Sequence, residues 1–287
     1  MDKRDYLYVY SEITGYGLTT LLFLDNIYHN DLYIKRAILA YNWIINYALH
    51  ISGGILSRKF FKDENANDNY SFEKSVIFTF DTSMVLFGLA GLYKKTGEKK
   101  ILKICKNIAD FLLKMENPKG GMYAFFDPHT LEKGDNDDKW SNQTGAFHAK
   151  CGMGLVKLYN ISKNKKYLEY AEALCDHALK YQESDGRFIT HRKESATLQH
   201  PHCYAAEGLL YCGKKLKRND YVKASENAVK WSLSTQLKNG GIPQKYHPDK
   251  GFIHYERTDI IGQILRLGCF YNKEGIKLKK LYNRLLE

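Results

Sequence analysis

Apolar residues recur along this chain at intervals of three and four, the spacing that places them on one face of an α-helix. Five stretches carry this pattern, and each breaks once at a short polar turn. The pattern predicts five helical hairpins, over residues 11–48, 80–127, 142–182, 200–237 and 258–286. The breaks predict turns near residues 29–31, 95–97, 162–164, 217–219 and 272–275.

The two helices of each predicted hairpin differ in kind. The first is apolar nearly all round and rich in small residues, as at residues 86–91 (LFGLAG), which is typical of a helix buried on most sides. The second is amphipathic, as where Ile101 and Ile108 alternate with Lys103. Inner buried helices inside outer amphipathic ones predict an all-α fold, the α/α toroid. We expect one domain over residues 1–287, with about five hairpins or an incomplete six-hairpin ring.

A return that contains glycine follows each of the first four amphipathic helices, at residues 53–54, 120–121, 186 and 240–241. Glycine accepts the left-handed backbone conformation that often ends a helix, so each return predicts a helix C-terminus. A unit repeated in this way indicates stacked hairpins that share a continuous core. Few strands are expected: residues 59–79 and residues 252–255 are each predicted to form a short hairpin in the loops over one face.

The composition limits the partners. The chain has 287 residues and a formal net charge of +11, but its lysines are spread over the predicted outer helices, which is typical of a solvated face. We therefore expect no nucleic-acid partner. The chain has no run of 18 uncharged apolar residues, so no membrane span is predicted. The first residues lack the features of a secretory signal, and a cytoplasmic location is therefore expected.

The six cysteines stand singly, without a CxxC pair, and predict buried free thiols, not a zinc knuckle or a disulfide framework. The glycine pairs follow helices and do not join a strand to a helix, so they form no phosphate-binding fingerprint. We therefore expect no cofactor. A metal site at His200, His202 and Cys203 is disfavoured, because these three residues are too close in sequence to ligate from one helical turn.

Polar and aromatic residues gather where the inner helices begin, and in a toroid these helix ends would meet at one mouth. A concave site with aromatic, carboxylate and histidine side chains is typical of ligand binding. The candidate catalytic residues are Asp81, Glu12, Asp259, His202 and Tyr204. The candidate substrate-binding residues are Tyr10, Trp140, Asn142, His148, His200, Glu207, Arg257 and Gln263.

Several candidates have a structural alternative. Asp81 precedes Thr82 as the N-cap of a helix would, with its carboxylate accepting first-turn N–H groups. His200 and His202 also fit buried structural histidines, and Trp140 fits core packing as well as sugar stacking. The gathering of these residues at one level of the repeat favours a site.

One mechanism that fits this inventory is glycan hydrolysis by two carboxyl groups, one of them with a raised pKa. Asp81 would be one of the pair, and Glu12, Asp259 or Glu207 would be the other.

A second mechanism is proton abstraction beside the carboxylate of a uronate sugar, as a lyase or an epimerase performs it. His202 or Tyr204 would then be the base and the acid, and Arg257 or Asn142 would neutralise the sugar carboxylate.

The repeat units at residues 80–102 and 148–188 resemble those of the six-hairpin glycan-active enzymes. That group includes unsaturated glucuronyl hydrolases, polysaccharide lyases and the helical domain of glucuronyl C5-epimerases. Residues 10–16 and 80–84 are similar to two segments of predicted bacterial and archaeal polysaccharide-biosynthesis proteins, with Ser11 inserted in one and Ser83 replacing a glycine in the other. His200, Tyr204 and the Gly-Leu-Leu at residues 208–210 resemble a third segment. The glycine- and tryptophan-rich sugar-binding segment of the unsaturated glucuronyl hydrolases has no counterpart here.

The resemblance implies a carbohydrate-active enzyme of polysaccharide metabolism that acts on an acidic, uronate-containing oligosaccharide or polysaccharide by hydrolysis, elimination or epimerisation. The alternative is a non-catalytic helical-repeat module that binds a glycan or a protein during polysaccharide biosynthesis. A terpenoid cyclase or prenyl-transfer toroid is the third hypothesis, although its site would be more apolar. The sequence sets no oligomeric state.

Overall fold

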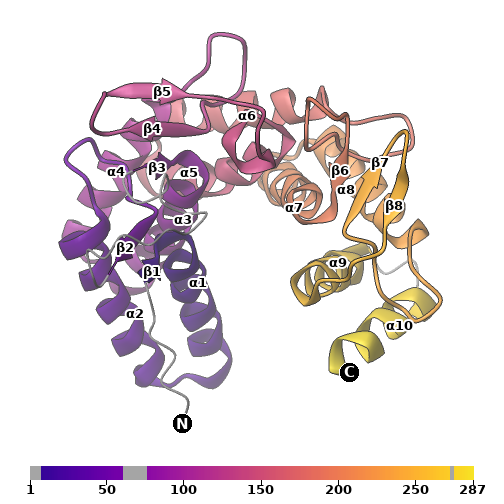
Figure 1. Cartoon of the computed structure of the whole chain (residues 1–287). Helices are drawn as coiled ribbons and strands as arrows, with labels where there is room; N and C mark the ends of the chain where they lie inside the picture. Colours follow the sequence, from indigo (N-terminus) through magenta and orange to yellow (C-terminus); the bar gives the residue numbers. More distant parts are fainter. Residues whose placement is uncertain (1–7, 61–75, 272–274) are drawn as a thin grey trace. The chain divides into compact units, whose positions relative to one another are not determined.

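The computed structural model describes residues 8–60, 76–271 and 275–287, which form helical hairpins joined by small antiparallel sheets (Figure 1). The first two hairpins are α1 (Ser11–Tyr28) with α2 (Asp31–Trp43) and α3 (Thr79–Thr96) with α4 (Lys99–Lys114). The others are α5 (Gly152–Ser162) with α6 (Lys165–Leu179), α7 (Gln199–Leu216) with α8 (Asn219–Ser234), and α9 (Thr258–Tyr271) with α10 (Gly275–Leu286). The five predicted hairpins are confirmed.

Irregular helices modify two of the hairpins. A π-helix, η1 (Ile44–Ala48), continues α2, and two 3-10 helices, η3 (Trp140–Asn142) and η4 (Ala146–Cys151), come before α5. Of the predicted turns, residues 272–274 lie outside the described residues.

The chain divides into two compact units, and each is described here by itself. Unit 1 comprises Met1–Asn117, Met122–Asp135 and Gly154–Tyr170, and unit 2 comprises Pro118–Gly121, Asn136–Met153 and Ala171–Glu287. The single domain and the common mouth of the inner helices therefore stay predictions.

Unit 1 is built on the close packing of α1 against α3. A Cβ atom on Gly15 would lie 2.8 Å from the backbone of Met84, and one on Gly88 would lie 2.9 Å from the carbonyl oxygen of Gly15, so the two glycines let the helices touch. Helix α3 is buried on most sides, as expected of a first helix. Helix α1 differs, because Ile13 and Phe23 are 58% and 60% exposed.

Unit 2 is built on α7, which packs against η4, α8 and α9. Gly208 makes the first of these contacts possible, since a Cβ there would lie 2.3 Å from the backbone of Ala149. The packing brings the first turns of α7 and α9 and the helix η4 into one neighbourhood.

The described strands form three small sheets, and the first strand of each leads directly into an inner helix. β1 (Tyr8–Tyr10) leads into α1 and pairs with β2 (Arg58–Phe60). In the second sheet β3 (Ile77–Phe78) leads into α3 and is followed by β4 (Phe125–Asp127) and β5 (Glu132–Gly134). In the third, β6 (Thr197–Leu198) leads into α7 and is followed by β7 (Lys245–His247) and β8 (Gly251–Ile253).

The predicted strand pairing is therefore wrong at residues 59–79, since the two ends of that stretch pair with β1 and β4, while residues 61–75 lie outside the described ones. At residues 252–255 only the first two belong to a strand, β8, whose partner is β7.

The glycine returns are confirmed as repeats but do not end helices. Gly53, Gly120, Gly186 and Gly240 all take a positive φ, between 92° and 96°, which favours glycine. Gly120 comes six residues after the last residue of α4, inside a turn closed by an isolated bridge between Glu116 and Met122. The left-handed conformation serves this turn, in which the backbone passes close to the next outer helix.

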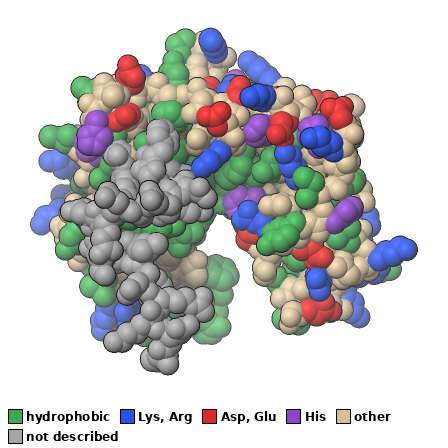
Figure 2. Space-filling view, in the orientation of Figure 1, with side chains coloured by type: hydrophobic (Ala, Val, Ile, Leu, Met, Phe, Trp, Pro, Cys, Tyr) green, Lys and Arg blue, Asp and Glu red, His purple; other side chains and the backbone are tan. Residues whose placement is uncertain are grey.

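Lysine and arginine side chains are dispersed among acidic and uncharged ones over the face drawn in Figure 2. Of the helices that are described, none combines the length and the apolar character needed to cross a bilayer. All six cysteines are free, and five of them are buried; Cys269 is exposed.

Candidate functional site

The N-terminal turn of α7 holds His200, which is bound by a carboxylate from the first turn of α9. Nδ1 of His200 lies 2.8 Å from Oδ2 of Asp259. Because a carboxylate accepts and cannot donate, Nδ1 carries a proton, and in the neutral imidazole the lone pair then lies on Nε2. For the described residues no hydrogen bond is recorded at Nε2, and the side chain of His200 is 17% exposed. The imidazole is therefore oriented as a base that a ligand can reach.

The side chain of Gln263 also contacts His200. Its side-chain nitrogen lies 3.2 Å from Nδ1, while its buried Oε1 has no hydrogen-bond partner among the described residues. A nitrogen cannot donate to an Nδ1 that is already protonated. Turning the amide by 180° places Oε1 beside Nδ1–H, whose one hydrogen it then shares with Asp259, and this also gives the buried oxygen a partner.

Aromatic rings form the wall beside this histidine. The ring centroid of Trp140 lies 5.7 Å from that of His200 and 6.4 Å from that of Tyr204, and the rings of His200 and Tyr204 are 4.4 Å apart. Trp140 is half-buried, whereas Tyr204 is buried. An indole that is partly open to solvent offers an apolar face for a ring-shaped ligand and a polar N–H beside it. We refer to Trp140, His200, Tyr204 and Asp259 as the histidine cluster.

A network of opposite charges adjoins the histidine cluster. Glu207 lies 2.8 Å from the ammonium of Lys150 and 2.7 Å from the guanidinium of Arg266. The Lys150 ammonium also stands 3.9 Å from the centroid of the Tyr204 ring, where the negative face of the ring attracts it. Burial raises the pKa of Glu207, but Lys150 and Arg266 outweigh that effect and hold the pKa below its ordinary value. Glu207 is thus ionised and suited to hold Lys150 in position.

Asp259 is ionised for a similar reason. Arg257 donates two hydrogen bonds to it, of 2.9 and 2.7 Å. Burial raises the pKa of Asp259, but His200 and Arg257 outweigh that effect and lower the pKa below its ordinary range. A carboxylate so stabilised is a poor proton donor and a good partner for an imidazole.

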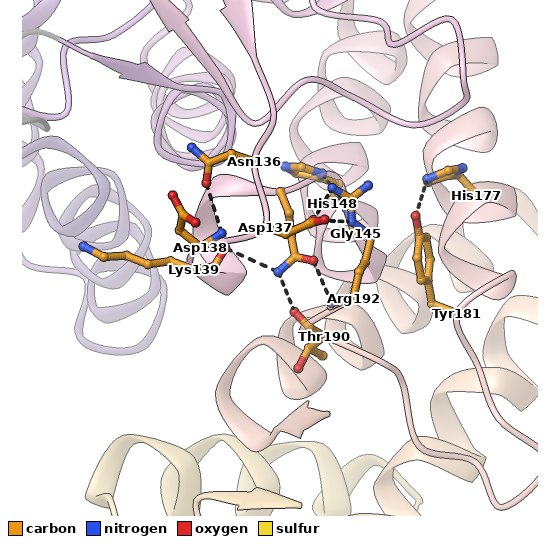
Figure 3. A network of polar contacts seen from close by, with 11 residues as sticks. Asn136, Asp137, Asp138, Lys139, Gly145, His148, His177, Tyr181, Thr190 and Arg192 are labelled. Carbon is orange, nitrogen blue, oxygen red and sulfur yellow. Dashed lines mark hydrogen bonds and ion pairs between the residues drawn. The ribbon is translucent and has the colours of Figure 1, made fainter. Parts of the chain in front are cut away.

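The loop that carries Trp140 is fixed by buried polar contacts. Gln143 is fully buried; its amide donates to the carbonyl oxygens of Lys139 and Thr190, both at 3.3 Å, and accepts from the backbone N–H of Arg192 at 2.9 Å. The Arg192 side chain pairs with Asp137 at 2.6 Å (Figure 3). Two loops are thereby tied together, and one of them carries Trp140.

Three predicted site residues have structural surroundings outside the histidine cluster. His202 is buried: its Nδ1 accepts from Phe188 N–H at 3.1 Å, and its Nε2 lies 3.0 Å from the carbonyl oxygen of Ala228, to which it donates. Burial lowers the pKa of His202 to about 4. With both nitrogens bound to backbone, we leave His202 out of the proposed catalytic set.

His148 is also buried, and its Nδ1 accepts from Gly145 N–H at 3.4 Å (Figure 3). Burial, and then the nearby His177 and Arg192, lower the pKa of His148 to about 3. Asn142 belongs to η3, where its side-chain oxygen accepts from the Ser141 hydroxyl at 3.2 Å.

Unit 1 contains a second group of predicted residues, at the first turns of α1 and α3. The hydroxyl of Tyr10 lies 3.5 Å from Oδ1 of the buried Asp81, and the guanidinium of Arg58 lies 4.6 Å from the centroid of the Tyr10 ring. Burial, and then the charge of Glu12, raise the pKa of Asp81 well above its ordinary value, although Arg58 opposes them. We call Glu12 and Asp81 the carboxyl pair. A carboxyl group with a raised pKa can hold a proton at neutral pH and deliver it.

Asp81 is not the N-cap of α3. That position belongs to Phe78, and no side chain caps this helix end. Asp81 lies in the first turn, where a carboxylate favours the helix when it is ionised.

Three contributors to these groups escaped the sequence analysis: Lys150, Arg266 and Asp137. A signal for Lys150 was present, because it is a cation within an apolar helical stretch and a buried ammonium requires a partner. The side chain of Arg266 is 50% exposed and carries no such requirement. Asp137 stands in a polar loop and gave no such signal. Within the described ranges, no group of three or more His, Cys, Asp or Glu residues is arranged to hold a metal ion.

No protein-family model and no curated protein matches the sequence. Solved structures do match the fold. A sugar epimerase from a ruminal bacterium is similar over 98% of this chain and 76% of its own, with a TM-score of 0.77 and 13% identity. The cellobiose 2-epimerase of Bacillus thermoamylovorans is similar over 98% and 75%, with a TM-score of 0.77 and 12% identity. A GH76 alpha-mannanase of Bacteroides thetaiotaomicron is similar over 99% and 72%, with a TM-score of 0.70 and 13% identity. The fold is thus an all-α toroid of the kind found in glycan-active enzymes.

Proposed function

We propose that this chain is a carbohydrate-active enzyme that moves a proton on a reducing sugar, as an epimerase or an isomerase does. The observation that carries the proposal is the 2.8 Å contact between Asp259 and His200, which leaves Nε2 as a base beside Trp140 and Tyr204. The fold supports it, since two of the similar structures are a sugar epimerase and a cellobiose 2-epimerase.

The chemistry needs a base next to a carbonyl group. When Nε2 of His200 removes the proton from the carbon beside the aldehyde, the electron pair of that C–H bond forms a C=C bond and the carbonyl oxygen takes up the negative charge. Return of a proton to the opposite face of the same carbon restores the carbonyl group and gives the epimer. Return of the proton to the former carbonyl carbon gives the ketose, provided that the hydroxyl proton of the adjacent carbon passes to the enolate oxygen. Asp259 stabilises the imidazolium that forms in between, in the way a carboxylate orients a catalytic histidine.

The aromatic residues have separate roles in this proposal. Trp140 is the stacking surface for the sugar ring, and Tyr204 is the second proton-transfer residue, with its ring fixed between His200 and Lys150. Gln263 keeps the proton on Nδ1 of His200.

The charge of the sugar is a finer proposal. Arg257 already donates two hydrogen bonds to Asp259, and Arg266 is bound to Glu207. A uronate would have to share these cations with protein carboxylates, whereas a neutral sugar would not. A neutral reducing sugar is therefore our first choice, and a uronate-containing oligosaccharide is the second.

Hydrolysis of a glycan is the second candidate function, and the carboxyl pair favours it. Asp81 is buried beside Glu12 with a raised pKa, and glycosidases use a protonated carboxyl group together with an ionised one. The similar fold of the alpha-mannanase is consistent with this candidate.

One panel of assays distinguishes these functions. The protein is incubated in D2O with neutral reducing disaccharides and with uronate oligosaccharides, and NMR follows deuterium at the carbon beside the carbonyl group, new reducing ends and unsaturated uronates. Proton transfer predicts deuterium uptake with no new reducing ends. New reducing ends without deuterium uptake would overturn it in favour of hydrolysis by the carboxyl pair. A blank panel together with sugar binding in calorimetry would favour the non-catalytic module.

A further inference from the structure

A cavity of about 330 Å3 opens in unit 1 beside the C-terminal ends of α1 and α3, and it belongs to neither group of residues discussed above. Its lining comes from α1, α3 and α5: Leu22, Asn26, Gly91, Lys94, Lys95 and Lys157. The volume lies at the lower end of the range for small-molecule sites. Three of these six residues are lysines, so the charge of the lining favours an anionic ligand.

Lys157 is unusual because its ammonium is drawn into the helix packing. The nitrogen lies 3.1 Å from the carbonyl oxygen of Phe87 and 3.8 Å from the centroid of the Phe87 ring. Gly91 makes room for it, since a Cβ there would lie 2.8 Å from this nitrogen. An ammonium has three N–H donors, and in the described part of the chain Phe87 O is the one acceptor recorded for it.

The positive charge at this cavity is only partly balanced. Lys95 pairs with the buried Asp25 at 2.5 Å, so that charge is compensated. For Lys94 and Lys157 no carboxylate partner is recorded among the described residues. Burial, and then the charge of Lys94, lower the pKa of Lys157 to about 8, which reflects the cost of keeping two ammonium groups near each other. An anion between them would remove that repulsion.

We propose that this cavity binds the phosphate group of a small phosphorylated molecule, which Lys94 and Lys157 hold by their charges. A phosphate monoester carries up to two negative charges and three acceptor oxygens, which suits two ammonium groups better than a single carboxylate would. Asn26 supplies an amide for the hydroxyl groups of such a ligand, and Leu22 supplies an apolar contact. This proposal does not rest on the proposed function.

The attraction for phosphate comes from the lysine side chains, because the helix C-termini at this cavity disfavour an anion. Lys94 and Lys95 lie in the last turn of α3, whose exposed carbonyl groups favour cations over anions. Removing one lysine should therefore weaken the attraction for phosphate, because no backbone N–H group replaces it.

The test is calorimetric titration of the whole chain with glucose 6-phosphate, inorganic phosphate and glucose. We expect glucose 6-phosphate to bind more tightly than inorganic phosphate, and glucose not to bind here. Lys157→Met and Lys94→Gln should each weaken binding of the phosphate compounds by at least about tenfold. Lys214→Gln is the matched control, because Lys214 lies in the last turn of α7 with no place in this cavity.

A second measurement keeps the test decisive if Lys157→Met folds poorly. Reductive 13C-methylation reports the pKa of Lys157 by NMR, and this pKa should rise when phosphate is added to the wild type. Equal affinity in Lys94→Gln and Lys214→Gln, or a pKa of Lys157 that does not respond to phosphate, would overturn the proposal. Equal binding of inorganic phosphate and glucose 6-phosphate would restrict the ligand to phosphate alone and contradict the contacts proposed for Asn26 and Leu22.

Discussion

Acid should destabilise this fold through His202. Backbone hydrogen bonds at both of its ring nitrogens fix the imidazole in one tautomer. Phe188 N–H donates to Nδ1, so the ring proton sits on Nε2 and donates to Ala228 O. A second proton has no place at Nδ1 unless it displaces the Phe188 N–H. The folded protein therefore resists protonation of His202, and burial lowers its pKa to about 4.

The sign of the effect follows from this lowered pKa. The unfolded chain takes up the proton as the pH falls below about 6.5, whereas the folded chain does so only near 4. The stabilisation is complete above pH 6.5 and is lost as the pH falls. Between pH 8 and pH 5 the loss is about 2 kcal/mol for this one residue, and it approaches about 3 kcal/mol near pH 4.

Urea unfolding followed by circular dichroism at pH 8, 6.5 and 5 measures this loss. His202→Gln should lower the free energy of unfolding at pH 8, on the order of 1–3 kcal/mol for backbone groups left unpaired. It should also reduce the difference between pH 8 and pH 5 by about 2 kcal/mol. His129→Gln, at an exposed histidine in the turn between β4 and β5, is the control and should change neither quantity. An unchanged pH dependence in His202→Gln would refute the reasoning.

Three further predictions concern packing and the site. Glu207→Gln leaves the buried Lys150 ammonium without its carboxylate partner and should lower the free energy of unfolding in urea by about 2–4 kcal/mol. The double variant with Lys150→Met should recover most of this loss. Gln143→Ala should raise KM for the sugar more than it lowers kcat, with a red-shifted tryptophan emission; a protein of unchanged emission and KM would contradict the positioning role. Gly240→Ala should cost about 1–3 kcal/mol because of its positive φ of 92°, whereas Gly17→Ala, in an open position of α1, should gain up to about 1 kcal/mol; equal thermal shifts would argue against the turn geometry.

The hairpins could be predicted from the sequence because helix periodicity is a local property. The breaks at residues 29–31 and 217–219 lie where α1 gives way to α2 and α7 to α8. Strand pairing is not local, so residues 59 and 60 could be recognised as extended without any sign that β1 would be their partner.

The sequence could predict that the site lies where the inner helices begin. It could not predict which side chains contact each other there. Trp140, His200, Tyr204 and Asp259 do come together, because each stands at the start of an inner helix or just before one. Which partner holds which side chain depends on distances across helices, so the pairing of Asp259 with His200 could not be foreseen.

The same limit applies to His202. It stands two residues from His200 in the sequence, and on a helix this separation turns it toward a different face. Contacts with Phe188 and Ala228, far along the chain, decided its surroundings.

The most direct test of the proposed function is deuterium uptake by a reducing disaccharide in D2O, measured by NMR at the carbon beside the carbonyl group. Wild type and His247→Gln should exchange this proton at equal rates, since His247 lies at the end of β7, beside Asp249 of the following turn, and is outside the histidine cluster. His200→Gln should lose at least about a hundredfold in rate at an unchanged melting temperature, within the range expected for loss of a general base. Exchange by His200→Gln at the wild-type rate would contradict the account.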